Sequence, residues 1–171
     1  KGLLLERFNF KSSDQDVKDK PFIANIGNYL FLLFYIILPF SHRYSFFGHF
    51  NDTLALISSI LLFKGYVMIF LVFKQNSYAS PIIRNQKERN HEIITTGLYK
   101  YVRHPMYTAC VLIFISTPLM LNSLLGFLFG IFLSHVFCKR IHVEEEFLIK
   151  EFPTYVEYQN KVKYKIFPFI F

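Results

Sequence analysis

Long uncharged stretches constrain this sequence more than any other feature. Residues 22–40 contain no charged side chain, and this length is close to the ~20 residues with which an α-helix crosses a hydrocarbon core about 30 Å thick. Residues 53–73 form a second apolar run, interrupted only by Lys64. Because an ammonium group facing lipid is costly, we expect Lys64 to face other helices or to extend toward the membrane surface.

A third apolar run, residues 107–137, is too long for a single span and carries Pro118 and Asn122 near its midpoint. Turn-forming residues at that position predict a helical hairpin with two short or tilted spans, about 107–119 and 123–138. The sequence therefore predicts an all-α, polytopic membrane protein with about four transmembrane helices. We expect an extramembrane tail over 1–21 and a single membrane domain over 22–171, whose segment 139–171 is cytosolic or interfacial.

Lysine and arginine are distributed asymmetrically between the loops of this topology. The segments before the first span, between the second and third spans, and after the fourth carry five, six and six of them, whereas residues 41–52 carry one and residues 120–123 none. Because basic loops favour the cytosolic side, both termini and residues 74–106 are predicted to be cytosolic. The net charge of +7 is thus explained by contact with anionic lipid, and a nucleic-acid partner is not expected.

Several other classes of protein lack support in the sequence. The only cysteines, Cys110 and Cys138, lie inside or beside apolar runs, which argues against an extracellular disulfide framework. The sequence contains neither a glycine-rich phosphate loop nor the G-x-S-x-G nucleophile elbow. No motif therefore supports a nucleotide hydrolase or a serine hydrolase.

A polar stretch, residues 91–107, separates the second and third apolar runs and is the first candidate site. Gly97 permits a sharp turn within it. The stretch could carry chemistry, or it could be an interfacial loop whose basic residues touch lipid phosphates and whose tyrosines lie at headgroup level. Its side chains suited to either role are His91, Tyr99, Arg103, His104 and Tyr107.

Two further groups lie on the helix predicted around residue 140. Arg140 and Glu144 are four residues apart and share a face, beside Glu145 and Glu146. They could bind a ligand or form a solvated salt bridge. A second group, with i, i+3, i+7 spacing that suits either a zinc site or ordinary helix packing, has no second metal-binding cluster to support it; its members are His135, Cys138 and His142.

Three sequence segments around the predicted hairpin resemble a known family. They are T-T-G-L-Y-K-Y-V-R-H-P-M-Y at 95–107, R-I-H-V-E-E at 140–145 and F-P-F-I at 167–170. In this order and spacing, over about residues 60–171, they resemble the eukaryotic isoprenylcysteine carboxyl methyltransferases. The resemblance implies a multi-span protein of the endoplasmic reticulum membrane. It would methylate the C-terminal carboxylate of prenylated cysteine in proteins, with S-adenosylmethionine as cofactor and no metal.

The resemblance also implies roles for individual residues. Arg140 would be the catalytic and substrate-binding residue, because it would hold the prenylcysteine carboxylate. The residues expected to surround the methyl donor are His91, Glu92, Ile93, Ile94, Tyr99, His104, Pro105, Met106, Tyr107 and Glu144.

The chemistry of that reaction suits these residue types. A C-terminal carboxylate, with a pKa of about 3.3–3.7, is already ionised at neutral pH and needs no general base. An arginine can orient it through two parallel hydrogen bonds, so catalysis would come mainly from alignment and exclusion of water. Two alternatives stay open at this point. One is a related phospholipid or small-molecule methyltransferase, and the other is a non-catalytic membrane scaffold or lipid-binding protein.

Overall fold

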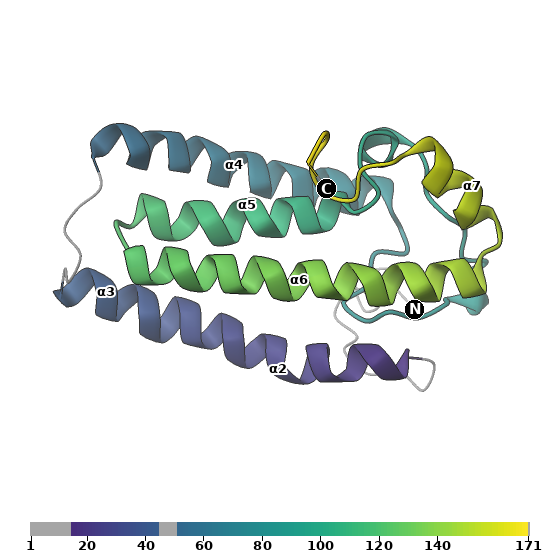
Figure 1. The fold of residues 1–171 in the computed structure, drawn as a ribbon, viewed down its shortest axis with the longest axis horizontal. Helices are drawn as coiled ribbons and strands as arrows, with labels where there is room; N and C mark the ends of the chain where they lie inside the picture. The colour runs from purple at the N-terminus through teal and green to yellow at the C-terminus, as the bar shows by residue number, and fades with distance from the viewer. Residues whose placement is uncertain (1–14, 45–50, 171) are drawn as a thin grey trace. The chain divides into compact units, whose positions relative to one another are not determined.

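The computed structural model describes residues 15–44 and 51–170, and every regular element in these ranges is a helix (Figure 1). The all-α prediction is therefore confirmed. Most of the predicted tail, residues 1–14, lies outside the described residues.

The described chain forms two compact units. Of the described residues, one unit, here called the polar unit, comprises 15–24, 70–105 and 139–170. The other, here called the apolar unit, comprises 25–44, 51–69 and 106–138. The boundary falls within helices that continue from one unit into the other, and each unit is described by itself below.

The first long helical stretch, which belongs to the apolar unit from residue 25 onward, consists of three consecutive elements. These are α2 (Lys20–Phe31), η2 (Leu32–Ile37) and α3 (Leu38–Tyr44). The middle element is a π-helix, whose wider turn ends with Leu38 N–H donating to the Leu33 carbonyl. Pro39 follows directly, and its ring cannot donate a backbone hydrogen bond and crowds the preceding turn. The local widening of the helix is explained by this proline.

The remaining long helices are α4 (Asp52–Gln75), α5 (Pro105–Met120) and α6 (Leu124–Glu151). Helix α5 begins at a proline, which is pre-organised for the first helical position. The chain reverses after α5 through Asn122, whose φ of 55° is left-handed. Ser123 then accepts a 2.9 Å hydrogen bond from Gly126 N–H and so caps the start of α6. The reversal lies where the hairpin was predicted.

Small residues and aromatic rings set the packing in the apolar unit. A Cβ on Gly65 of α4 would contact α5, and a Cβ on Gly130 of α6 would lie 2.2 Å from the carbonyl oxygen of Phe114 in α5. Tyr29 of α2 packs edge-on against Phe132 of α6, with 5.5 Å between ring centroids. In this unit α5 therefore lies between α4 and α6, and α2 packs on α6 (Figure 1).

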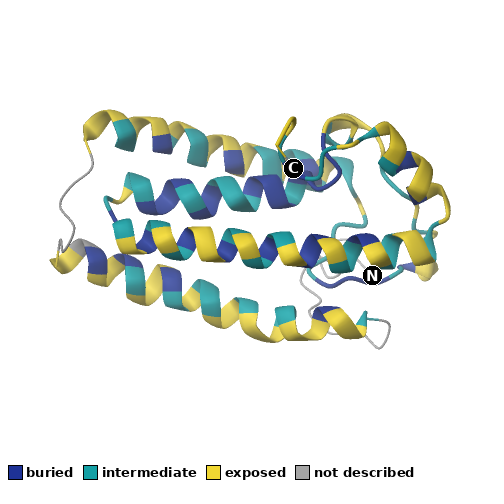
Figure 2. Cartoon of the chain, viewed as in Figure 1, coloured by how far each residue is buried: buried dark blue, intermediate teal, exposed yellow. Residues whose placement is uncertain are grey.

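Among the residues that the structure describes, three helical stretches are long and apolar enough to cross a membrane: Val17–Ser41, Asp52–Gln75 and Leu124–Glu151. The third predicted span, 107–119, corresponds to α5, which has 16 residues and a length of about 24 Å. Tyr35, Phe63 and Leu128 expose more than half of their surface, as expected where lipid covers a helix (Figure 2). Lys64 is exposed as well. The expectation that it faces other helices of this chain is therefore wrong, and its exposure agrees with the alternative, a side chain that extends toward the membrane surface.

The polar unit is built mostly from loops around the end of α6. Its short elements are η1 (Val17–Asp19), η3 (Lys87–Arg89), η4 (Gly97–Lys100) and α7 (Thr154–Lys161). The loop between α4 and α5, residues 76–104, ends next to the C-terminal segment, residues 162–170. Arg103 N–H donates to Tyr164 O, and His104 N–H donates to Lys165 O. These bonds place two distant parts of the sequence next to each other.

Candidate functional site

Arg140 is the first predicted site residue whose surroundings the structure defines. Its Nε donates to Asp19 Oδ1 at 2.8 Å, and its Nη2 donates to Asp19 Oδ2 at 3.2 Å. Nη2 also donates to the Pro81 carbonyl, and the guanidinium carbon lies 4.2 Å from the centroid of the Phe22 ring. Arg140 therefore binds a carboxylate along one edge while an aromatic face covers it.

Asp19 is held in place by more than this arginine. Its Oδ2 also accepts hydrogen bonds from Ile83 N–H at 2.9 Å and from Gln15 Nε2 at 3.2 Å, and its side chain is fully buried. Sequence reasoning missed Asp19, since 121 positions separate it from Arg140 and no local pattern links the two.

A second buried network centres on Glu145. Its Oε1 lies 2.6 Å from Arg103 Nε and 3.2 Å from His104 Nε2, and its Oε2 lies 3.3 Å from Lys165 Nζ. Tyr155 donates its hydroxyl to Oε1 at 3.4 Å. Several cationic or polar groups thus converge on one carboxylate, which the sequence had presented only as the neighbour of Glu144.

The network around Glu145 also fixes the C-terminal segment. Nη1 of Arg103 donates to the carbonyl oxygens of Val162 and Lys163 at 2.7 and 2.8 Å. Because the guanidinium joins this backbone to Glu145, Arg103 holds the loop, α6 and the C-terminal segment together.

Glu144, the acid predicted to meet the methyl donor, lies beside this network. Its Oε2 is 3.9 Å from Nδ1 of His104, and its side chain is 28% exposed, whereas that of His104 is 5% exposed. The structure thus places Glu144 and His104 together, with the carboxylate closer to solvent than the imidazole.

Tyr99 lies in the turn that Gly97 opens. Gly97 has a φ of +61°, and a Cβ there would lie 2.3 Å from Gln75 Oε1, which accepts a hydrogen bond from Leu98 N–H. The Tyr99 hydroxyl accepts from Asn76 Nδ2 at 2.8 Å. Burial raises the pKa of Tyr99 to about 12, so its hydroxyl is neutral at physiological pH.

His91 packs between two aromatic rings. Its ring centroid lies 4.5 Å from that of Tyr78 and 4.9 Å from that of Phe152. Burial, together with the nearby charges of Arg89 and Arg84, lowers the pKa of His91 to about 4. The imidazole is therefore neutral at physiological pH.

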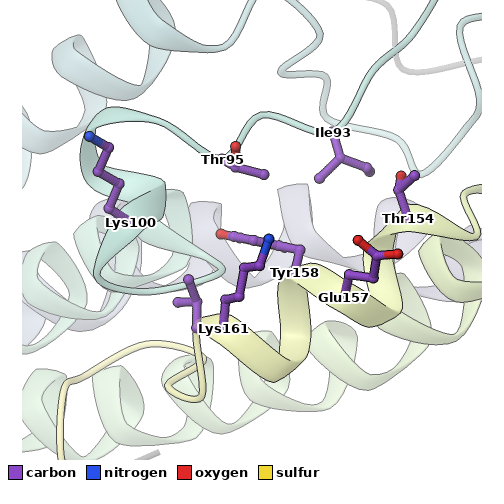
Figure 3. A pocket seen from close by; sticks show the side chains of 8 residues that line it. Ile93, Thr95, Lys100, Thr154, Glu157, Tyr158 and Lys161 are labelled. Carbon is purple, nitrogen blue, oxygen red and sulfur yellow. The ribbon is translucent and has the colours of Figure 1, made fainter.

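A pocket of about 470 Å³ lies between the 93–100 segment and α7 (Figure 3). Glu157 and Lys161 of α7 point toward the loop segment that carries Ile93 and Thr95 (Figure 3). Ile93 is the one predicted donor-binding residue in its lining, whose full membership is Ile93, Thr95, Lys100, Thr154, Glu157, Tyr158, Lys161 and Val162.

The other predicted residues lie elsewhere or contribute less. Glu92 is exposed and Ile94 is half-buried in the loop, and Pro105 is fully buried at the start of α5. Met106 and Tyr107 belong to the apolar unit; there Tyr107 packs edge-on against Phe137 with 5.6 Å between centroids.

No group of three or more metal-binding side chains occurs in the described parts of the chain. Of the three residues whose spacing allowed a zinc site, His142 lies with its Nε2 3.3 Å from Lys165 Nζ. A lysine ammonium at that distance is a poor neighbour for a metal cation.

Comparison with known proteins gives matches to one family. The model of the isoprenylcysteine carboxyl methyltransferase family matches residues 54–150. The protein-S-isoprenylcysteine O-methyltransferase of Saccharomyces cerevisiae is 42% identical over 93 residues, which are 53% of this chain and 38% of the relative. The Schizosaccharomyces pombe protein of that name is 33% identical over 85 residues, 48% of this chain and 36% of the relative.

The human protein-S-isoprenylcysteine O-methyltransferase is 32% identical over 93 residues, or 53% of this chain and 33% of the relative. The matched part of the chain thus spans about a third of the length of these relatives. The region matched by the family model includes the 91–107 stretch and the segment from Arg140 to Glu145.

Proposed function

The chain belongs to the isoprenylcysteine carboxyl methyltransferase family, and we propose that it methylates the C-terminal carboxylate of prenylated cysteine in proteins, using S-adenosylmethionine. Its partners would be prenylated protein C-termini and membrane lipid. As an integral membrane protein with long apolar helices, it would reside in the endoplasmic reticulum, with its site and both termini facing the cytosol.

The observation that carries this proposal is the edge-on binding of a carboxylate by Arg140. A buried guanidinium that already holds both oxygens of Asp19, at 2.8 and 3.2 Å, has the geometry that a C-terminal carboxylate would need. The substrate is ionised at neutral pH, so Arg140 needs only to orient it. We propose that this orientation, with water excluded, supplies most of the rate enhancement by this residue.

Two of the residues named as donor contacts have a charge state that suits the proposed methyl donor, and a third, Ile93, lines a pocket of suitable size. When bound, S-adenosylmethionine supplies an electrophilic methyl group on a positively charged sulfur. His91 and Tyr99, which do not line the pocket, are neutral and place no positive charge beside such a group. The pocket lining itself carries Lys100 and Lys161 together with the carboxylate of Glu157. The pocket volume of about 470 Å³ falls in the range of small-molecule sites.

The residues that would hold the donor remain those named from the family resemblance. Glu144 is partly exposed, so it can meet the donor's amino group. Tyr99 offers an aromatic face, while His104 is held by Glu145. The remaining proposed contacts are His91, Glu92, Ile93, Ile94, Pro105, Met106 and Tyr107.

The test is methyl transfer from labelled S-adenosylmethionine to N-acetyl-farnesylcysteine by the chain in lipid. Arg140→Ala should lower kcat/KM by about 10- to 100-fold, because a charge-assisted contact is worth about 1.5–3 kcal/mol, and loss of alignment would add to this. Binding of the donor should persist. The matched control is Lys139→Ala, which removes a neighbouring exposed cation and should leave turnover unchanged.

Two results would contradict the proposal. Wild-type turnover by Arg140→Ala would show that this residue does not hold the carboxylate. Donor binding without product from the wild type, followed by methylation of an amine-bearing lipid, would assign a different acceptor.

A further inference from the structure

The contact between Asp19 and Arg140 has a consequence for substrate binding. Asp19 makes the two-oxygen contact that the substrate carboxylate would make with the same guanidinium. We propose that Asp19 is an internal competitor for Arg140, which must release the guanidinium when the substrate carboxylate binds and which therefore sets the substrate affinity. This inference rests on the proposed role of Arg140.

Because Arg140 is buried, its guanidinium needs a counter-charge when no substrate carboxylate is bound. Arg140 is 8% exposed and Asp19 is 1% exposed, and a buried guanidinium without a counter-charge is strongly destabilising. Asp19 supplies that counter-charge in the substrate-free protein. The contact therefore stabilises Arg140 in its buried position.

Two carboxylates cannot share this edge of the guanidinium at little cost. A substrate carboxylate that approached while Asp19 stayed in place would meet a like charge in a poorly solvated position. Exchange of one carboxylate for the other keeps one negative charge beside Arg140 throughout. The net free energy of substrate binding from this contact is then small, which avoids the over-tight ground-state binding that adds nothing to kcat.

Besides Arg140, the Asp19 carboxylate is held by hydrogen bonds from Ile83 N–H and Gln15 Nε2. Asp19 ends η1, a single turn of three residues. The turn is preceded by a backbone hydrogen bond from Asp16 N–H to Ile83 O at 2.9 Å. The nearby ion pair of Lys18 with Glu146 is exposed on both sides, and such pairs contribute little. Release of Arg140 requires the buried Asp19 side chain and its bonds to Ile83 N–H and Gln15 Nε2 to rearrange together with this turn.

The decisive experiment compares binding of N-acetyl-farnesylcysteine with binding of its methyl ester, which lacks the anionic carboxylate. In the wild type the two ligands should bind with similar affinity. In Asp19→Asn the acid should bind about tenfold more tightly or better, because the competing charge is gone. The ester should bind as before, which also shows that the variant is folded.

Two companion variants make the comparison specific. Asp16→Asn removes a carboxylate from the same segment that bonds Lys18 N–H rather than Arg140, and it should leave the ratio of acid to ester affinity unchanged. Gln15→Ala removes the 3.2 Å hydrogen bond to Asp19. It should also raise the affinity for the acid relative to the ester, by a smaller factor than Asp19→Asn does. If Asp19→Asn does not fold, Gln15→Ala decides the question.

The opposite results have distinct meanings. Unchanged or weaker acid binding in Asp19→Asn, with a lower kcat, would overturn the proposal and make Asp19 a residue that only positions Arg140. In the double variant with Arg140→Ala, the gain for the acid should disappear, and a gain that persisted would also overturn it. Failure of the wild type to form any methyl ester would instead refute the proposed function.

Discussion

At the scale of single residues, burial sets the charge of His91. Its folded-state pKa of about 4 lies below the ordinary value of about 6.5, so between these pH values the unfolded chain binds a proton that the folded chain does not. The stabilising contribution of the neutral imidazole is therefore complete above about pH 6.5 and is lost as the pH falls toward 4.

This shift predicts a difference in thermal unfolding between the wild type and His91→Gln. From pH 7 to pH 5, in lipid or detergent, the wild-type Tm should fall further than that of the variant, because glutamine does not titrate. Phe152→Ala removes a ring that packs on His91, so the pH dependence of its Tm should lie between the other two. Equal slopes for the wild type and His91→Gln would show that this imidazole is not held neutral.

The partners of Arg140 and Glu145 separate what a local sequence pattern can predict from what only the tertiary structure shows. Arg140 and Glu144 could be placed on one helix face from their i, i+4 spacing, because a helix face is a local pattern. The carboxylate bound to Arg140 could not be predicted, since Asp19 is 121 positions away. The network of Glu145 with Arg103, 42 positions away, is likewise a tertiary arrangement that no local pattern specifies.

At the scale of elements, the helices could be predicted from hydropathy, and their interruptions from particular residues. Pro118 and Asn122 indicated the reversal that the structure places between α5 and α6. The π-helix before Pro39 could not be predicted, because a proline permits several local adjustments and tertiary packing selects among them.

The contact between α5 and α6 gives a prediction about packing. A Cβ at Gly130 would lie 2.2 Å from the Phe114 carbonyl oxygen, so Gly130→Ala must force the two backbones apart. Overpacking of this kind typically costs about 1–3 kcal/mol. The matched control is Gly27→Ala in α2, where a Cβ would meet nothing within 4 Å and should stabilise the helix slightly.

The measurement is thermal unfolding of both variants in the same lipid or detergent. Gly130→Ala should unfold at a lower temperature than the wild type, and Gly27→Ala at the same or a higher temperature. A Gly130→Ala variant as stable as the wild type would mean that α5 and α6 do not pack closely through this glycine.

At the scale of the whole molecule, loop charge predicts orientation in the membrane. Residues 74–106 carry six lysines and arginines, whereas 41–52 carry one, and short basic loops are retained in the cytosol. In a background of Cys110→Ser and Cys138→Ser, a cysteine at Lys87, whose side chain is 79% exposed, should react with a membrane-impermeant maleimide in intact endoplasmic reticulum vesicles. A cysteine at the exposed Thr53 should react only after the vesicles are permeabilised. If only Thr53→Cys were labelled in intact vesicles, the chain would have the opposite orientation to the predicted one. The proposed site could then not reach cytosolic prenylated proteins.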